Sequence, residues 1–315
     1  MEASSVGCTA GHRLEMSRGV GHVHGVFDGA INVLLSNGLI SLVPEAGERG
    51  PLNILLRLPA EAQRMSSLGI RTGDRVVRNN SSLELGDRHR VSLGSARTYS
   101  PRRKFALPNL EKLEILANLE AVTNRALLRG NKAGLGELLT LAAPGAATLE
   151  AEGLNMFASA ALPRILRLEE AFLSEEKTMM TAAVGELVGL GPGLTPSSDD
   201  LLAGLVLMCA LYARNFGRAR RAILVVTRAV AEQPPGRTTI LSEEFLRQAA
   251  SGRGNERVMG LCTSMLTGGR ESVERETERV LAIGETSGTD TVLGVVLGTM
   301  LCAGTRFGSE ERGPG

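Results

Sequence analysis

The sequence predicts an α+β protein in which a small β-barrel or sandwich-like domain precedes a mainly α-helical domain. Up to about Ser100, short β-rich runs are separated by turn residues, as in small all-β domains. Beyond that point, apolar residues recur with the spacing of helices. The 315 residues are enough for two domains, each with a buried core. We expect a β-rich domain over 1–104, a helical domain over 105–306 and a flexible tail over 307–315.

The expected strands are short and follow one another closely. Asn37-Gly38 separates two of them and favours a hairpin, because both residues tolerate a positive φ. A loop rich in Ser, Pro and basic residues, Ser95–Lys104, ends the series, and the domain boundary is expected between Ser95 and Pro108. The predicted strands are His22–Phe27, Ala30–Leu35, Leu39–Val43, Leu52–Leu56, Arg75–Val77 and Arg90–Leu93.

The helical domain is predicted to start with a helix that Asn109 caps and that ends before Gly130. Junctions that contain glycine, such as Gly268-Gly269 and Gly284, then divide the chain into further helices. These are predicted at 153–170, 172–188, 197–214, 218–232, 240–251, 255–267, 271–283 and 289–303.

The composition excludes several classes of function. With 35 Lys and Arg against 34 Asp and Glu, the net charge of +1 argues against nucleic-acid binding driven by overall charge. Aromatic residues are only 3% with no Trp, so stacking platforms for bases are scarce, whereas 38 glycines allow sites built from backbone amides. The longest apolar run, Leu201–Ala213, is too short to span a membrane.

The cysteines indicate a reducing compartment. Cys8, Cys209, Cys262 and Cys302 lie far apart and never form a CxxC pair. Free thiols in apolar runs usually pack as small hydrophobic side chains. The N-terminus also lacks the apolar core of a secretory signal. We therefore expect a cytoplasmic protein without disulfides or a zinc site.

The strongest functional signal is the segment GLGPGLTPSSDD at residues 189–200, which leads directly into an apolar run. Thr195 and Pro196 form a strong helix start. Free amides at a helix N-terminus, with the positive end of the helix dipole, attract anions, and hydroxyl groups add donors. The segment is not a Walker loop, since no Lys-Ser/Thr follows the glycines. Its candidate substrate-binding residues are Gly191, Gly193, Thr195, Ser197 and Ser198.

A second segment, GETSGTD at residues 284–290, resembles the first and also leads into an apolar helix. Without gaps both read Gly-x-Thr-x-x-Ser/Thr-Asp, so that Asp290 corresponds to Asp199. We hypothesise that the two helix N-termini converge on one polar pocket. A third stretch with clustered hydroxyl groups opens another predicted helix. The candidate substrate-binding residues of these two stretches are Ser287, Gly288, Thr289, Thr238 and Thr239.

The candidate catalytic residues are Asp199, Asp200 and Asp290. Carboxylates beside apolar surface are costly unless they are paired, hydrogen-bonded or bound to a metal. They would ligate Mg²⁺, the one candidate cofactor, act as a general base, or hold cationic or amide groups of a substrate. The residues leave these roles open, and the metal ligands stay unassigned. The structural alternative is simple capping, because Thr, Ser and Asp are ordinary residues of a helix start.

Four stretches of the sequence resemble the AllH family, which is linked to oxamate carbamoyltransferase of anaerobic allantoin breakdown. They are GVFDGAINVLLSNGLISLV (25–43), GLGPGLTPSSDDLLAG (189–204), TTILSEEFLRQAASG (238–252) and TSGTD (286–290). The resemblance spans most of the chain, from about Gly25 to Gly304. Ser198 stands where a Gly is expected and Glu285 where a His or similar residue is expected, which leaves the substrate within the family open.

The resemblance implies a subunit of a multi-component carbamoyltransferase that works with FdrA-like and AllG-like subunits. Such an enzyme interconverts oxamate and carbamoyl phosphate with oxalurate and phosphate. Helix N-termini would hold the phosphate or the oxamate carboxylate, and an aspartate would accept the proton of the attacking nitrogen. Two alternatives stay open: a stand-alone Mg²⁺-dependent hydrolase or transferase that uses the paired aspartates, and a non-catalytic scaffold subunit.

Overall fold

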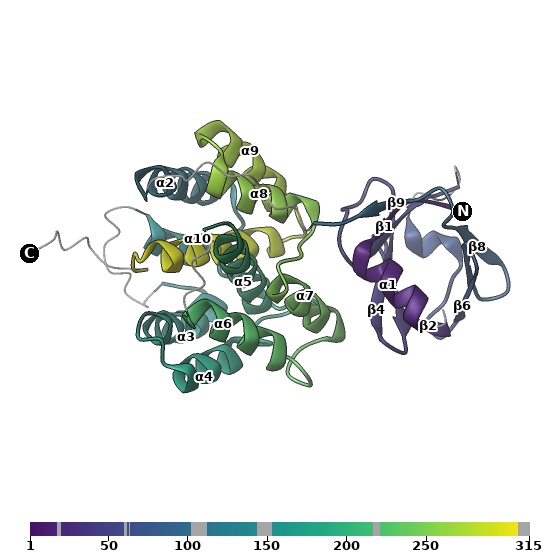
Figure 1. Cartoon of the computed structure of the whole chain (residues 1–315), viewed down its shortest axis with the longest axis horizontal. Helices are drawn as coiled ribbons and strands as arrows, with labels where there is room; N and C mark the ends of the chain where they lie inside the picture. Colours follow the sequence, from purple (N-terminus) through teal and green to yellow (C-terminus); the bar gives the residue numbers. More distant parts are fainter. Residues whose placement is uncertain are drawn as a thin grey trace, which may run out of the picture. The chain divides into compact units, whose positions relative to one another are not determined.

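A computed structural model describes residues 1–17, 20–59, 62, 64–101, 112–143, 153–216 and 221–307. The chain forms two structural units, Met1–Arg103 with Gly254–Glu256, and Lys104–Arg253 with Arg257–Gly315. Each unit has its own cluster of buried apolar side chains. The first unit is a β-barrel and the second is helical, so the predicted fold class is confirmed (Figure 1).

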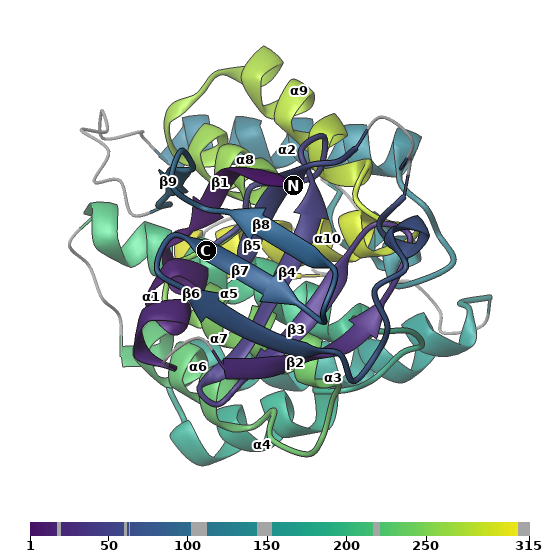
Figure 2. The ribbon, with the colours of Figure 1, turned by 90° about the vertical axis from the view of Figure 1, so that its right-hand side faces the viewer.

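Eight strands close the first unit into a barrel in the order β5-β4-β3-β2-β6-β7-β8-β1, and β1 pairs back onto β5. A ninth strand, β9, adds to β1 in parallel. Figure 2 labels these strands. The strands are β1 (Glu2–Gly7), β2 (Val20–Val26), β3 (Ile31–Leu35), β4 (Gly38–Pro44), β5 (Asn53–Arg57), β6 (Arg75–Asn79), β7 (Ser82–Leu85), β8 (His89–Ser92) and β9 (Arg97–Tyr99).

The barrel is held by aliphatic side chains such as Val33, Ile40 and Val76, which are fully buried. The predicted hairpin between β3 and β4 is present. Its two-residue turn is Ser36-Asn37, however, because Leu35 pairs with Gly38. Gly38 then opens β4 at φ 124°, in a region that favours glycine.

Three strands and two helices of the barrel unit have no counterpart in the sequence prediction: β1, β7, β9, α1 (Cys8–Met16) and the short 3-10 helix Met65–Leu68. β1 buries Ala3, Ser5 and Gly7, which are too small or polar to show as a hydrophobic alternation. β9 lies inside the stretch predicted as a loop, Ser95–Lys104, so that prediction was wrong there. β9 buries no side chain and depends on main-chain pairing with β1, which composition does not reveal.

All nine predicted helices are present, with ends that differ by a few residues. Asn109, the predicted cap of the first, and residues 102–108 of the predicted linker lie outside the described residues. Phe307, the first residue of the predicted tail, is buried, and its amide donates to Glu169 Oε1 at 2.5 Å. The helices are α2 (Lys112–Arg129), α3 (Met156–Leu173), α4 (Lys177–Leu187), α5 (Ser197–Phe216), α6 (Arg221–Glu232), α7 (Ile240–Ala250), α8 (Glu256–Thr267), α9 (Arg270–Leu281) and α10 (Ser287–Ala303).

α10 and α5 form the centre of the helical unit, with α2 and α9 on one side and α3, α4 and α6 on the other (Figure 1). Every residue of α10 from Gly288 to Cys302 is buried, as expected for a helix that is apolar all round. Glycines let the two central helices touch. A Cβ atom at Gly204 would lie 2.3 Å from the carbonyl oxygen of Thr291, and one at Gly294 would lie 2.0 Å from that of Leu201.

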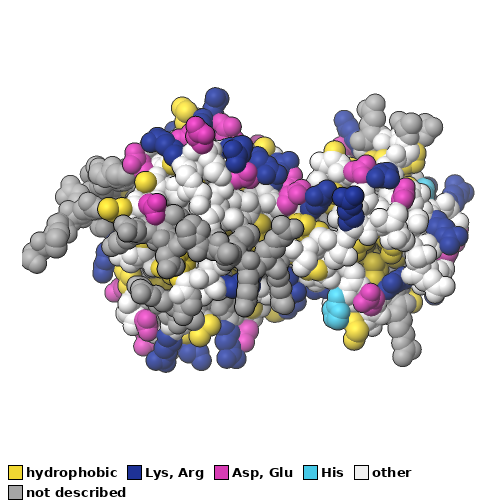
Figure 3. Space-filling model, turned by 45° about the horizontal axis from the view of Figure 1, so that its top comes forward, with side chains coloured by type: hydrophobic (Ala, Val, Ile, Leu, Met, Phe, Trp, Pro, Cys, Tyr) yellow, Lys and Arg dark blue, Asp and Glu magenta, His cyan; other side chains and the backbone are white. Residues whose placement is uncertain are grey.

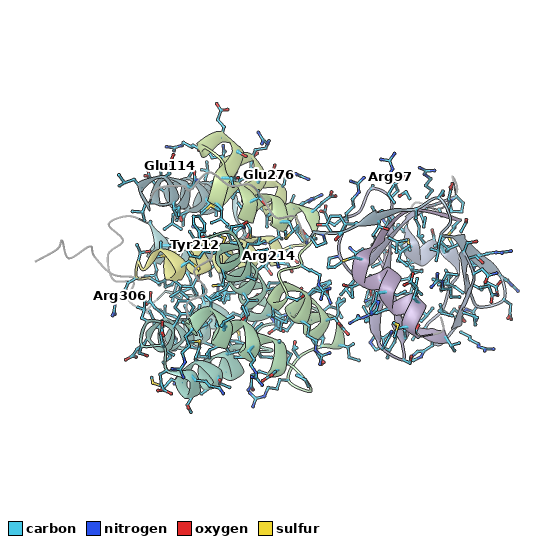
Figure 4. The ribbon with its side chains drawn as sticks, viewed as in Figure 1. Arg97, Glu114, Tyr212, Arg214, Glu276 and Arg306 are labelled. Carbon is cyan, nitrogen blue, oxygen red and sulfur yellow. The ribbon has the colours of Figure 1, made fainter. Side chains whose placement is uncertain are left out.

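Charged side chains of both signs are spread over the surface (Figure 3). Glu276 of α9 is buried, and its Oε2 accepts a hydrogen bond from Arg279 Nη1 at 2.8 Å (Figure 4). Among the helices in the described part of the chain, none combines the length and the apolar character that crossing a membrane requires.

Candidate functional site

The N-termini of α5 and α10 lie next to each other. Thr195 Oγ1, just before α5, and Ser287 Oγ, at the start of α10, are 3.1 Å apart and form a hydrogen bond. α7 starts beside them, because Thr239 Oγ1 donates to the carbonyl oxygen of Leu194 at 2.5 Å. Thr239 also caps α7 by accepting the amide of Ser242 at 3.1 Å. Three helix starts rich in hydroxyl groups therefore meet in one place.

The loop before α5 owes its path to three glycines with positive φ, Gly189 at 82°, Gly191 at 120° and Gly193 at 91°. A Cβ atom at Gly189 would also lie only 2.2 Å from the carbonyl oxygen of Arg237. Ser198 fixes this loop, because its Oγ lies 2.5 Å from Leu187 O and 2.7 Å from Leu190 O. Its amide donates to Leu190 O at 3.1 Å. The polar groups of Ser198 are thus used within the loop.

Asp199 joins α5 to α7 and is only 1% exposed. Its Oδ1 accepts the amide of Gly189 at 2.8 Å. Its Oδ2 accepts the hydroxyl group of Ser242 at 2.7 Å and also that of Thr238. Three donors satisfy this buried carboxylate from within the protein, which favours a positioning role for Asp199.

Asp290 is fully buried at the start of α10, where a loop that follows α2 packs against it. Its Oδ1 accepts the amide of Leu135 at 2.7 Å, and a Cβ atom at Gly134 would lie 2.5 Å from its Oδ2. The neighbouring Thr289 accepts the amide of Asn131 at 2.9 Å through Oγ1. Asp290 is the fourth residue of α10, the position that Asp200 has in α5, and like Asp199 it accepts an amide from a glycine-rich loop.

This loop, GNKAGLG at residues 130–136, was not predicted from the sequence. Its only signal was three glycines in seven residues. A Cβ atom at Gly136 would lie 2.9 Å from Thr289 Cγ2. Asn131 Nδ2 also donates to the carbonyl oxygen of Glu285 at 3.0 Å. The glycines bring backbone close to α10, a need that only the tertiary contact makes visible.

Asp200 and Asp290 each keep one buried oxygen, Oδ2, for which the described residues supply no hydrogen-bond partner. Burial raises the pKa of Asp290 to about 6, while hydrogen bonds from the Leu135 amide, Ser197 and Thr286 act to lower it. Burial also raises the pKa of Asp200 well above its usual range. The charges of Asp290 and Asp199 add to that rise, and hydrogen bonds with Ser287 and Thr195 oppose it.

The two carboxyl groups influence each other, because the negative charge of Asp290 helps to keep the proton on Asp200. Carboxyl groups whose pKa values are raised by burial and by a neighbouring charge are typical of functional sites. The residues whose hydroxyl groups act on these two carboxyl groups are Thr195, Ser197, Thr286 and Ser287.

Gly288, another of the candidate residues, lies in close contact with the backbone around the site. Gly288 packs so tightly that a Cβ atom there would lie 2.2 Å from the carbonyl oxygen of Val280. A surface groove between α4 and α6 contains none of the candidates; it is lined by residues such as Lys177, Thr181 and Arg228. Within the described ranges, no three His, Cys, Asp or Glu side chains are arranged so that they could hold a metal ion.

Comparison with known families covers both units. Residues 187–299 match the family model described as oxamate carbamoyltransferase subunit AllH, and residues 3–98 match the AllH family N-terminal domain. The first match contains the starts of α5, α7 and α10, and the second contains nearly all of the barrel strands. No solved structure matches the chain significantly. The resemblance seen in the sequence is confirmed, and the chain belongs to the AllH family.

Proposed function

We propose that this chain is a subunit of an oxamate carbamoyltransferase and binds its small anionic substrate at the N-termini of α5 and α10. The activity rests on the family match. The location rests on the hydrogen bond between Thr195 and Ser287, which joins the two helix starts. In the breakdown of allantoin the enzyme would interconvert oxamate and carbamoyl phosphate with oxalurate and phosphate.

The chemistry suits the residues at the helix starts. Two helix dipoles and the hydroxyl groups beside them favour a small anion. The amide nitrogen of oxamate attacks the carbamoyl carbon, a C–N bond forms, and the C–O bond to phosphate breaks. The nitrogen loses one proton, which the Asp290 carboxylate accepts and which leaves with the phosphate. A pKa of about 6 suits Asp290 to this task near neutral pH.

The name of the matching family model describes a subunit, so the rest of the enzyme is expected on other chains. We propose FdrA-like and AllG-like subunits for that part. Because all four cysteines are free, we also propose a reducing, cytoplasmic compartment.

Reconstitution tests this proposal. The chain is co-purified with the FdrA-like and AllG-like subunits, and phosphate release from carbamoyl phosphate is measured with and without oxamate. The double variant Thr195→Val, Ser287→Ala should lower kcat/KM for oxamate by about 100-fold or more, the loss typical of removed polar contacts in an active site. Thr227→Val, on α6 and away from the site, should keep full activity.

Two results would contradict the proposal in different ways. A wild-type complex that releases no phosphate in response to oxamate would refute the activity. Full activity in the double variant would refute the location, because the two hydroxyl groups would then play no part in substrate binding.

A further inference from the structure

The three aspartates of the site differ in how many of their acceptor positions are filled. Asp199 accepts three hydrogen bonds. Asp290 accepts the Leu135 amide through Oδ1. In contrast, Oδ2 of Asp290 and Oδ2 of Asp200 have neither solvent contact nor a partner among the residues that the structure describes. Buried acceptors are nearly always paired, so two unpaired ones at adjoining helix starts indicate that a ligand supplies the donors.

These oxygens restrict the chemistry of the ligand. The unprotonated oxygens of carboxyl groups accept N–H groups and repel anions, whereas the helix starts and the hydroxyl groups of Thr195 and Ser287 favour an anion. A ligand that satisfies both has an anionic end and an N–H end close together. The –NH2 group of a primary amide carries two donors, one for each unpaired oxygen.

We propose that Oδ2 of Asp200 and Oδ2 of Asp290 recognise the –NH2 group of a primary carboxamide and thereby select it over a carboxylate of the same shape. The inference rests on the proposed function, in which the ligand is oxamate. Its carboxylate faces the helix starts and the hydroxyl groups, and its amide nitrogen faces the two aspartates. The atom that accepts the carbamoyl group is then held beside Asp290.

Oxalate provides the matched comparison. It has the shape of oxamate but carries a second carboxylate where oxamate has the amide. It brings no N–H donor to the two aspartates and adds a negative charge beside them. Sites that hydrogen-bond an N–H group reject analogues without it strongly, by about 10⁴-fold or more in favourable cases.

The dissociation constants of oxamate and oxalate are measured by calorimetric titration of the reconstituted complex. We expect the wild-type complex to bind oxamate about 100-fold or more tightly than oxalate. Asp200→Asn and Asp290→Asn should each weaken oxamate binding and strengthen oxalate binding, because the Asn amide donates to a carboxylate. In each variant the preference for oxamate over oxalate should fall about tenfold or more. Asp87→Asn, in an exposed turn of the barrel unit, should leave it unchanged.

An unchanged preference in both folded Asn variants overturns the inference, and near-UV circular dichroism reports whether they are folded. Should they fail to fold, the wild-type complex alone decides with N,N-dimethyloxamate, which keeps the carboxylate but has no N–H donor. It should bind about tenfold or more weakly than oxamate, and equal binding overturns the inference.

The same titrations separate this inference from its alternatives. If chelation abolishes oxamate binding by the wild-type complex and Mg²⁺ restores it, while the Asn variants do not respond to Mg²⁺, the aspartates hold a metal ion and the inference is wrong. Oxamate-dependent transfer without any preference over oxalate refutes the inference alone. Absence of both transfer and oxamate binding refutes the proposed function and the inference together.

Discussion

At the scale of single residues, Asp290 shows how the central position of α10 affects stability. Burial is the main cause that raises its pKa from 3.8 to about 6, so the folded protein holds this proton more tightly than the unfolded chain does. Protonation therefore favours the folded state. The free energy of unfolding is therefore highest, as far as Asp290 is concerned, below about pH 4, where its carboxyl group is neutral. This stability is lost as the pH rises through about 6, where the buried carboxyl group ionises.

The substitution Asp290→Asn should stabilise the protein at neutral pH. Its amide oxygen can still accept the Leu135 N–H, but it cannot ionise. At about 1.36 kcal/mol for each pKa unit, a rise from 3.8 to about 6 predicts a gain of about 3 kcal/mol in the free energy of unfolding at pH 7.5. The gain should fall towards zero at pH 4. Urea denaturation between pH 4 and pH 8 measures it, and a gain that grows towards low pH would contradict the expected burial effect.

The sequence predicted all three aspartates as one catalytic group, and it could not rank them. Asp199 and Asp200 are neighbours on α5, but successive side chains of a helix point about 100° apart. Asp199 therefore meets the hydroxyl group of Ser242 on α7, while the charge of Asp290 on α10 helps to raise the pKa of Asp200. The packing of α5 between its neighbours decides which carboxyl group has all its hydrogen-bond acceptors paired. The local sequence pattern does not predict that packing.

At the scale of elements, apolar periodicity and the residues of helix starts predicted α2 to α10, because each of these helices buries a regular face or its whole surface. The same reasoning failed for β1, whose buried side chains are small or polar, and for β9, which buries none. The loop 130–136 was missed because its glycines serve contacts with Thr289 and Asp290, residues far along the chain.

The close contact between α5 and α10 predicts that alanine substitutions at its glycines destabilise the protein to different degrees. A Cβ atom at Gly294 would lie 2.0 Å from Leu201 O, and one at Gly298 would lie 2.8 Å from Leu205 O. A Cβ atom at Gly29 would meet nothing within 4 Å apart from its chain neighbours. Ala normally improves a helix by up to about 1 kcal/mol over Gly, so a loss must come from the contact. We expect Gly294→Ala to lose about 2 kcal/mol or more, Gly298→Ala less, and Gly29→Ala almost nothing.

Thermal unfolding monitored by circular dichroism gives the order of the three variants, and it also registers a variant that does not fold. An increase in Tm for Gly294→Ala would show that the two helices can separate without loss. The tight crossing would then not be what holds the two helix starts together.

At the scale of the whole molecule, the family models and the buried cores divide the chain in the same way. The N-terminal domain model covers residues 3–98, and the barrel unit extends over Met1–Arg103 with Gly254–Glu256. All candidate site residues lie in the helical unit, from Gly191 to Asp290. The proposed substrate site therefore depends on one of the two cores.

Two separate cores predict two thermal transitions, of which oxamate should move only one. Ligand at 100 times its dissociation constant adds about 2.7 kcal/mol to the unit that binds it. For a unit of about 200 residues this raises Tm by roughly 5–10 °C. Calorimetry of the chain or its complex measures both transitions. Val33→Ala, which removes buried side-chain atoms from the barrel core, should lower only the transition that oxamate leaves unmoved. A barrel transition that rises with oxamate would mean that the substrate is not held by the helix starts alone.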